Sequence, residues 1–594
     1  MKWAAGICTV FCFLALFRLL GRENTPTGDE PAYGAGQFGL FVEELFREEV
    51  KANTVNLHFT LAYPEKYGIG DYEATLGSYS LEDFEKAHSQ MDELVEELQK
   101  FDLSEFSREQ KLTYDILLDY ANLQLSAKDY TLLEEVLGPV TGYQIQLPML
   151  LAEYTFRTRQ DIEDYLVLVS QVDDVVEEIA AFEKEKSQAG FFMPDYAVDA
   201  VISQCNEFIA NPEENYMIEI FNDRIDSFGG LTWEEREGYK EENFSIVTTQ
   251  VASGYQSLVE ELKQLKGSGD NQQGLCYYEG GKEYYEYLVR AATGSDGSVT
   301  ELQERTEEFI ENYYDVLEKA LFQDTSLYSR MLGCQPSATE PEEILEEAAK
   351  KAEEDFPTPP AAGCTVKYVH PSLEENGILA YYLTTPVDDV ENNVIYINKK
   401  NLNMEEKTQA DFYATLVHEG YPGHLYQNVY TASCGLPLIR NLLSYPGYTE
   451  GWATYVECEY GFGFAVEDEA VAELLSQSQL FSLAVSSYMD MGIHYDGWSR
   501  PEAKEYLARL GIADEEMVDE FYEFMVEEPA CYLSYFIGCL EFMDLREKAQ
   551  GRLGEAFDAR GFHQFLLEMG PAPFYVIEEY MEEWLGEQIQ EEEP

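Results

Sequence analysis

Apolar residues recur at helical spacing along most of the chain, and this pattern constrains the fold more than any other feature. It is clearest at residues 81–101, where apolar and acidic positions alternate around a helix and Ser80 with Asp83 forms a candidate capping pair. The same pattern recurs at 108–127, 159–188, 195–210, 233–265, 298–321 and 340–355. It predicts a mainly α-helical protein with a small β-sheet.

A change of pattern follows the proline-rich segment at 357–363. Strand character appears there at residues 365–370, 380–384 and 394–398. The last is the strongest, because Val394, Ile395, Tyr396 and Ile397 are all β-branched or aromatic. This strand would either pair with an extended substrate or belong to a small structural sheet.

The composition break at 357–363 divides the chain into expected regions. We expect a helical lobe over 36–356 and a catalytic region over 357–590, with short strands around 365–398. Before them, residues 23–35 are typical of a polar linker.

The first 22 residues resemble a targeting segment. An apolar run from Ala4 to Phe17 follows Lys2 and is followed by Arg18 and Arg22, which is typical of a secretory signal or a short signal anchor. The run is shorter than the roughly 20 residues that span a bilayer. We expect an exported protein, secreted or held at the cell surface by this segment, with no other membrane contact.

The formal net charge of −74 restricts the partners. Such a charge argues against nucleic acid and anionic membrane surfaces as ligands. Solvated acidic helix faces account for most of the carboxylates, and cationic ligands remain compatible with it. We therefore expect no nucleic-acid partner.

Residues 418–424 (His-Glu-Gly-Tyr-Pro-Gly-His) hold two of only seven histidines in the chain. Two imidazoles and a carboxylate are the parts of a water-activating zinc site, with His418 and His424 as ligands and Glu419 as base. The spacing is unusual, because six residues rotate about 240° around a straight helix. Pro422 and the flanking glycines predict that the helix ends or bends between the histidines. A histidine pair that only caps or packs is the alternative.

Further candidates lie downstream. Glu450 falls in what is expected to be the following helix, which supplies the third ligand in one large class of zinc peptidases. Glu457 shares its helix face and suits a supporting role better than a ligand role. His494 and Tyr535 are candidates to donate to a developing oxyanion, with ordinary helix packing as the alternative for both.

Four motifs in one order resemble a known family. They are His418 through His424, Glu450-Gly451-Trp452-Ala453-x-Tyr455, Asp490-x-Gly492-Ile493-His494 with Gly497-Trp498, and Pro529 through Gly538. Together they resemble a bacterial domain-of-unknown-function family with an HE(A/G)xPGH motif, which is grouped with the HExxH-type zinc metallopeptidases. The resemblance covers roughly residues 36–590.

The resemblance implies a two-lobed helical metallopeptidase-like fold with a deep active-site cleft. It implies one zinc ion on His418, His424 and Glu450, Glu419 as base, and His494 and Tyr535 near the transition state. The chain departs from the family's common form at Leu425, which replaces a frequent histidine. It departs again at 530–532, where Ala-Cys-Tyr replaces a frequent Gly-Gln-Ala.

The sequence thus predicts an exported zinc metallopeptidase acting on peptides or small proteins. A metal-activated water would attack the peptide bond while Glu419 moves the proton. Two other functions stay open: an acidic cell-surface binding protein that has lost catalysis, and a zinc hydrolase of a non-peptide amide or ester. An intact Glu419 argues against the first, since a binding protein needs no base beside its ligands.

Overall fold

The computed structural model describes residues 33–269, 271–369, 379–400 and 408–592. The expected signal segment at 1–22 and most of the expected linker at 23–35 therefore lie outside the described residues. Within the described ranges, no helix is both long and apolar enough to cross a membrane. The described chain forms two compact units, which we call the N-terminal unit (33–284 and 520–528) and the C-terminal unit (285–519 and 529–592).

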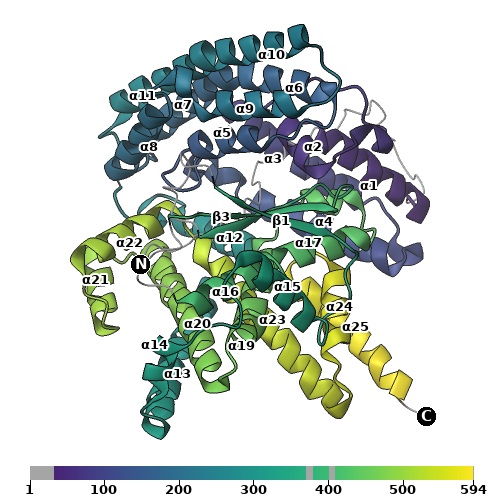
Figure 1. Ribbon diagram of the computed structural model, residues 1–594, viewed down its shortest axis with the longest axis vertical. Helices are drawn as coiled ribbons and strands as arrows, with labels where there is room; N and C mark the ends of the chain where they lie inside the picture. The colour runs from purple at the N-terminus through teal and green to yellow at the C-terminus, as the bar shows by residue number, and fades with distance from the viewer. Residues whose placement is uncertain (1–32, 270, 370–378, 401–407, 593–594) are drawn as a thin grey trace. The chain divides into compact units, whose positions relative to one another are not determined.

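The N-terminal unit is helical, and its helices run from purple to teal in Figure 1. Ser80 accepts a hydrogen bond from the amide of Asp83, as the capping pattern predicts. The helices are α1 Ala35–Val50, α2 Thr54–Thr60, α3 Leu81–Leu98, α4 Arg108–Ser126, α5 Tyr143–Glu153, α6 Arg159–Ser170, α7 Val172–Ala189, α8 Asp195–Phe208, α9 Tyr216–Ser227, α10 Trp233–Ile246 and α11 Ala252–Leu265. Unit boundaries fall inside α12 (Gly281–Thr293) and α22 (Glu515–Glu527).

The C-terminal unit holds the three-stranded sheet and every candidate site residue. Two π-helical turns, η10 (Glu457–Gly461) and η11 (Gly492–Asp496), continue α18 and α20. The helices are α13 Val299–Gln323, α14 Leu327–Gly333, α15 Pro341–Ala352, α16 Gln409–Glu419, α17 His424–Ser433, α18 Pro446–Val456, α19 Phe462–Ala465, α20 Glu469–Met491, α21 Arg500–Arg509, α23 Cys531–Leu553, α24 Ala559–Met569 and α25 Phe574–Glu592. The expectation of a mainly helical protein with a small sheet is confirmed.

The sheet has the order β1-β3-β2. The central strand β3 (Asn392–Ile397) pairs in parallel with β1 (Gly363–Tyr368) and antiparallel with β2 (Ala380–Leu383). Ile395 and Ile397 of β3 have no exposed surface, which explains the apolar run in this strand. β2 is an edge strand, and it packs beside α16, the helix that carries His418.

The boundary between the two compact units does not coincide with the composition break at 357–363. The first boundary falls between Tyr284 and Tyr285, so α13, α14 and α15, which precede the composition break, belong to the C-terminal unit. The reason is tertiary packing: α13 lies along α20, and α15 lies against α16.

Three glycines let α18 and α23 touch backbone to backbone. A Cβ atom on Gly538 of α23 would lie 2.2 Å from the carbonyl oxygen of Gly447 and 2.9 Å from the Cα atom of Gly451, both on α18. This close approach brings the helix of Glu450 against the helix of Tyr535.

Gly538→Ala should lower the free energy of unfolding by about 1–3 kcal/mol, because a methyl group has no space between the two backbones. Urea unfolding followed by circular dichroism measures the change. Gly551→Ala, on the same helix, is the control: a Cβ there meets no atom within 4 Å. Equal stability of the two variants would contradict the close-contact explanation.

Candidate functional site

A tight loop between two helices brings the two histidines together despite their six-residue spacing. α16 ends at Glu419 and α17 begins at His424, so the two imidazoles come from different helices. The loop contains a cis peptide bond between Tyr421 and Pro422. The helix end or bend that the sequence predicts between the histidines is confirmed.

Backbone hydrogen bonds hold this loop. The amide of Gly423 donates to the carbonyl oxygen of Val417 at 3.1 Å, and the indole of Trp452 donates to that of Pro422 at 2.9 Å. A Cβ atom on Gly423 would lie 1.8 Å from the carbonyl oxygen of His418, so only glycine fits there. Trp452 thus links the loop to α18, the helix of Glu450.

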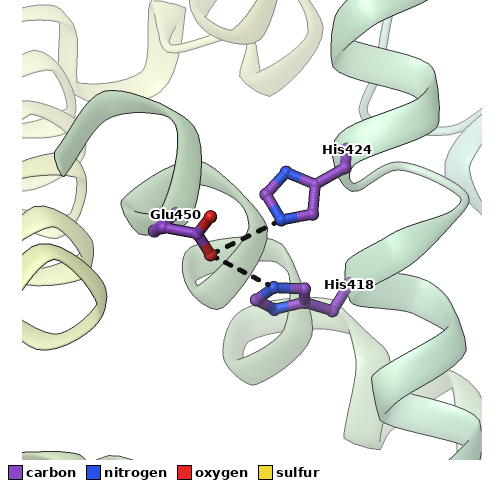
Figure 2. Close-up of side chains that lie close together, drawn as sticks. All are labelled: His418, His424 and Glu450. Atoms are coloured by element: carbon purple, nitrogen blue, oxygen red, sulfur yellow. Dashed lines mark ion pairs between the residues drawn. The ribbon is translucent and has the colours of Figure 1, made fainter. Parts of the chain in front are cut away.

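The three candidate ligands converge on one point. The Nε2 atoms of His418 and His424 lie 3.6 and 3.5 Å from the same oxygen, Oε2 of Glu450, as Figure 2 shows. The candidate ligand atoms of the three residues lie within 4.8 Å of one another. All three side chains are buried.

These residues fit a zinc ion. Two ligand atoms about 2.0–2.1 Å from a tetrahedral zinc are about 3.4 Å apart. The two imidazole nitrogens lie at 3.6 and 3.5 Å from Glu450 Oε2, close to this separation. Both carboxylate oxygens of Glu450 are buried, and neither has a hydrogen-bond partner among the described residues. A buried carboxylate without hydrogen bonds is costly unless a cation compensates it. Two imidazoles and one carboxylate are also a donor set that zinc accepts.

The pKa shifts show how the buried charges compensate one another. Burial lowers the pKa of His418, but its interactions with Glu450 and Glu457 outweigh burial and raise it well above the ordinary value. Burial likewise raises the pKa of Glu450, but the charge of His424 and the interaction with His418 hold it well below its usual range. The centre therefore favours positive charge next to Glu450, which a proton or a divalent cation supplies.

Glu457 contacts the side of the His418 ring that faces away from Glu450. Its Oε2 atom lies 3.1 Å from Nδ1 of His418, the ring nitrogen that faces away from Glu450. A carboxylate in this position fixes the orientation and tautomer of an imidazole and increases its basicity. The supporting role expected for Glu457 from its place on the helix agrees with this geometry.

Glu457→Gln should weaken zinc binding about 10- to 100-fold, because the amide cannot supply the charge that makes His418 a better ligand. Competition with a chelating dye measures the affinity. Glu459→Gln is the matched control: it lies in the same π-helical turn, but its carboxylate is paired with Arg546. Unchanged zinc affinity in Glu457→Gln would show that Glu457 does not make His418 a better ligand.

Glu419 is held by the edge strand of the sheet. Its Oε2 atom accepts a hydrogen bond of 2.8 Å from the backbone amide of Tyr382 in β2. Burial raises the pKa of Glu419, partly offset by the charges of His418 and His424. The Tyr382 hydroxyl in turn donates to Asn393 of β3 and accepts from Asn428 of α17. Tyr382 therefore connects the sheet with both helices of the histidine motif.

The two candidates for an oxyanion donor have different surroundings. The Tyr535 ring lies nearly parallel to the His418 ring, with centroids 6.3 Å apart, and keeps 8% of its surface exposed. His494 lies in the π-helical turn η11, has no exposed surface, and stacks on Tyr285 with centroids 5.2 Å apart. Tyr535 thus lies beside a candidate ligand.

The sequence offered no signal for Tyr382. Its contact with Glu419 is made by a backbone amide, which every residue except proline carries. The strand character of 380–384 and its position ahead of the histidine motif were the nearest indications.

The fold and the site define a helical protein with a buried two-histidine, one-glutamate centre beside a small sheet. The chain belongs to a family described as bacterial protein of unknown function (DUF885), whose model matches residues 64–581. No curated protein matches the sequence.

Two solved structures share the fold. A crystal structure described as "the putative lipoprotein from Colwellia psychrerythraea" has a TM-score of 0.81 and 19% identity, over 93% of this chain and 99% of that chain. A "putative lipoprotein of unknown function from Shewanella oneidensis" has a TM-score of 0.62 and 16% identity, over 93% of this chain and 100% of that chain. At these identities the likeness concerns the fold alone.

Proposed function

We propose that this protein is a zinc-dependent peptidase, with His418, His424 and Glu450 as metal ligands and Glu419 as general base. The observation that carries the proposal is the Glu450 carboxylate, which is buried, lacks hydrogen bonds and lies 3.5 and 3.6 Å from two imidazole nitrogens. Glu419 directly follows the first ligand in the chain, and its carboxylate is also buried.

A bound zinc ion would supply Lewis acidity, polarising a carbonyl group and making water more acidic. Glu419 then takes a proton from the attacking water and delivers it to the leaving nitrogen. Its raised pKa suits a group that first accepts and then returns a proton. Tyr535, rather than the fully buried His494, donates a hydrogen bond to the carbonyl oxygen as charge develops on it.

The edge strand supports a peptide as substrate. The amide of Tyr382 in the edge strand β2 donates to Glu419, so this edge of the sheet runs beside the proposed base. An extended peptide that adds to a sheet edge forms backbone hydrogen bonds whatever its side chains are. Such a peptide would run past Glu419, with a scissile bond in reach of the base.

The expected location follows from the N-terminal sequence. A signal-like segment at 1–22 directs the chain out of the cytoplasm, as a secreted or surface-held protein. The solved structures with the same fold carry the word lipoprotein in their descriptions, which agrees with export.

Incubation with a mixture of synthetic peptides, read by mass spectrometry, tests the proposed activity. We expect zinc-dependent cleavage that a chelator stops and added zinc restores. Zinc binding without any cleavage would instead favour a binding protein. Hydrolysis of amide or ester reporters, but of no peptide, would favour a zinc hydrolase of non-peptide amides or esters.

Cationic peptides should be the better substrates, because the net charge of −74 attracts them. Electrostatic steering raises association rates by about 10- to 1,000-fold at low salt. We expect a lysine-rich peptide to have a higher kcat/KM than a glutamate-rich peptide of equal length, with the ratio falling as salt is added. Salt-independent kcat/KM values would show that the charge does not select the substrate.

A further inference from the structure

The start of α23 is capped by a residue from another helix. Its N-cap is Ala530, which has no side chain for capping and a φ of +64°. Among the described residues other than glycine, it is the one with a positive φ. The amide of Ala530 donates to both carboxylate oxygens of Asp490, at 3.1 and 2.9 Å. Asp490 lies near the end of α20.

Asp490 is completely buried. The hydroxyl of Tyr285 donates to its Oδ1 atom, and the His494 ring stacks on Tyr285. The Asp496 carboxylate adds a negative charge that raises the pKa of Tyr285. Burial raises the pKa of Asp490 to about 7, although the hydrogen bonds from Tyr285 and Ala530 act in the opposite direction.

The helix that Asp490 caps carries Tyr535. Tyr535 lies just over one turn beyond Ala530, and its ring faces His418. Further along α23, the backbone contact of Gly538 with α18 fixes the helix. The first turn lies before that contact, so its position depends on what holds Ala530.

We propose that Asp490 is a positioning residue for Tyr535: its carboxylate caps α23 and so sets where the Tyr535 hydroxyl lies relative to the metal centre. The inference rests on the proposed function for the role of Tyr535, but the capping itself does not. A carboxylate at a helix N-terminus is stabilised by the free amides and the helix dipole. It also offsets the cost, about 1–2 kcal/mol, of a left-handed conformation at a residue with a side chain.

Protonation of Asp490 changes this cap. The ionised carboxylate accepts hydrogen bonds at both oxygens, whereas the protonated acid has one oxygen that carries a proton and accepts less well. The bond from Ala530 therefore favours the ionised form, but burial opposes ionisation and outweighs it. Opening that brings water to Asp490 thus becomes easier as the pH rises towards about 7. Tyr285 contacts Asp490 directly, His494 stacks on Tyr285, and the Asp496 carboxylate acts on Tyr285 through its charge.

Hydrogen exchange tests the cap without any substrate. After correction for the intrinsic pH dependence, peptides covering 529–540 of the wild-type chain should lose protection as the pH rises towards about 7, and the loss should level off above it. Asp490→Asn should remove this loss. Tyr285→Phe should move it to higher pH, because the hydroxyl lowers the pKa of Asp490. Equal, pH-independent protection in all three proteins would overturn the proposal.

A double-mutant cycle tests the link to Tyr535. On a cleaved peptide, Tyr535→Phe should lower kcat by about 100- to 1,000-fold. Asp490→Asn should lower it by up to about 100-fold through misplacement, with little change in KM. The double variant should lose no more than Tyr535→Phe alone, since Asp490 acts through Tyr535. If the losses in kcat of the two single variants multiply in the double variant, Asp490 does not act through Tyr535, and the proposal is wrong.

The remaining outcomes separate two kinds of failure. If the wild-type chain cleaves no peptide, the proposed function fails, while hydrogen exchange still decides on the cap. If Asp490→Asn does not fold, Tyr285→Phe carries the test, because it leaves the bonds from Ala530 in place. The thermal midpoint of Asp490→Asn at pH 8 should not fall below that of the wild type, since the variant no longer buries a charge. A purely structural role would lower it.

Discussion

Replacing Glu419 with glutamine is expected to lower kcat by on the order of 10²–10⁴-fold while zinc stays bound. The amide cannot take a proton from water, but its oxygen can still accept the hydrogen bond from the amide of Tyr382. The link between α16 and β2 is thereby kept. The measurement is kcat on the fastest peptide from the cleavage screen, with zinc determined by elemental analysis.

Glu346→Gln provides the control for this change, because Glu346 is an exposed residue of α15. It should leave both kcat and zinc content as they are in the wild type. Substantial turnover by Glu419→Gln would contradict the role of Glu419 as base. Loss of zinc from that variant would show that the carboxylate serves the metal instead.

The second large effect is expected from His424→Ala. This change removes one of two imidazoles and leaves the Glu450 carboxylate with His418 alone. Zinc affinity should fall by more than the roughly 100-fold seen when only supporting contacts are lost. At a zinc concentration 1,000-fold above its Kd, the wild type should gain about 4 kcal/mol of stability, and the variant should gain less than about 1.4 kcal/mol.

His88→Ala is the matched histidine variant, since His88 lies on α3 in the N-terminal unit. Its zinc affinity and its zinc-induced rise in thermal midpoint should equal those of the wild type. Calorimetric titration and thermal unfolding measure the two quantities. Wild-type zinc affinity in His424→Ala would place the metal elsewhere.

Much of the fold was predictable from periodicity and capping residues, but breaks within long helices were not. The apolar pattern over 159–188 predicts one helix, whereas the structure has α6 and α7 separated at Gln171. The Gln171 side chain bonds to the carbonyl oxygen of Ala74 and the amide of Leu76. Contacts with a remote segment set this break, and local sequence cannot reveal them.

The site was predictable where residue type carries the chemistry. Two histidines, the adjacent Glu419 and the later Glu450 were found from their spacing and context, and the structure brings the three candidate ligands together. The contacts of Glu419 with Tyr382 and of Asp490 with Ala530 were not predictable. Both use backbone amides, and both depend on how distant elements pack.

Stepwise return of zinc to the metal-depleted chain tests the central claim most directly, with peptide hydrolysis as the readout. Activity should rise linearly and level off at about one zinc per chain, as expected for a single three-ligand site. His424→Ala should stay inactive over the same range. Hydrolysis that does not depend on zinc, or zinc bound at about one per chain with no hydrolysis, would contradict the account.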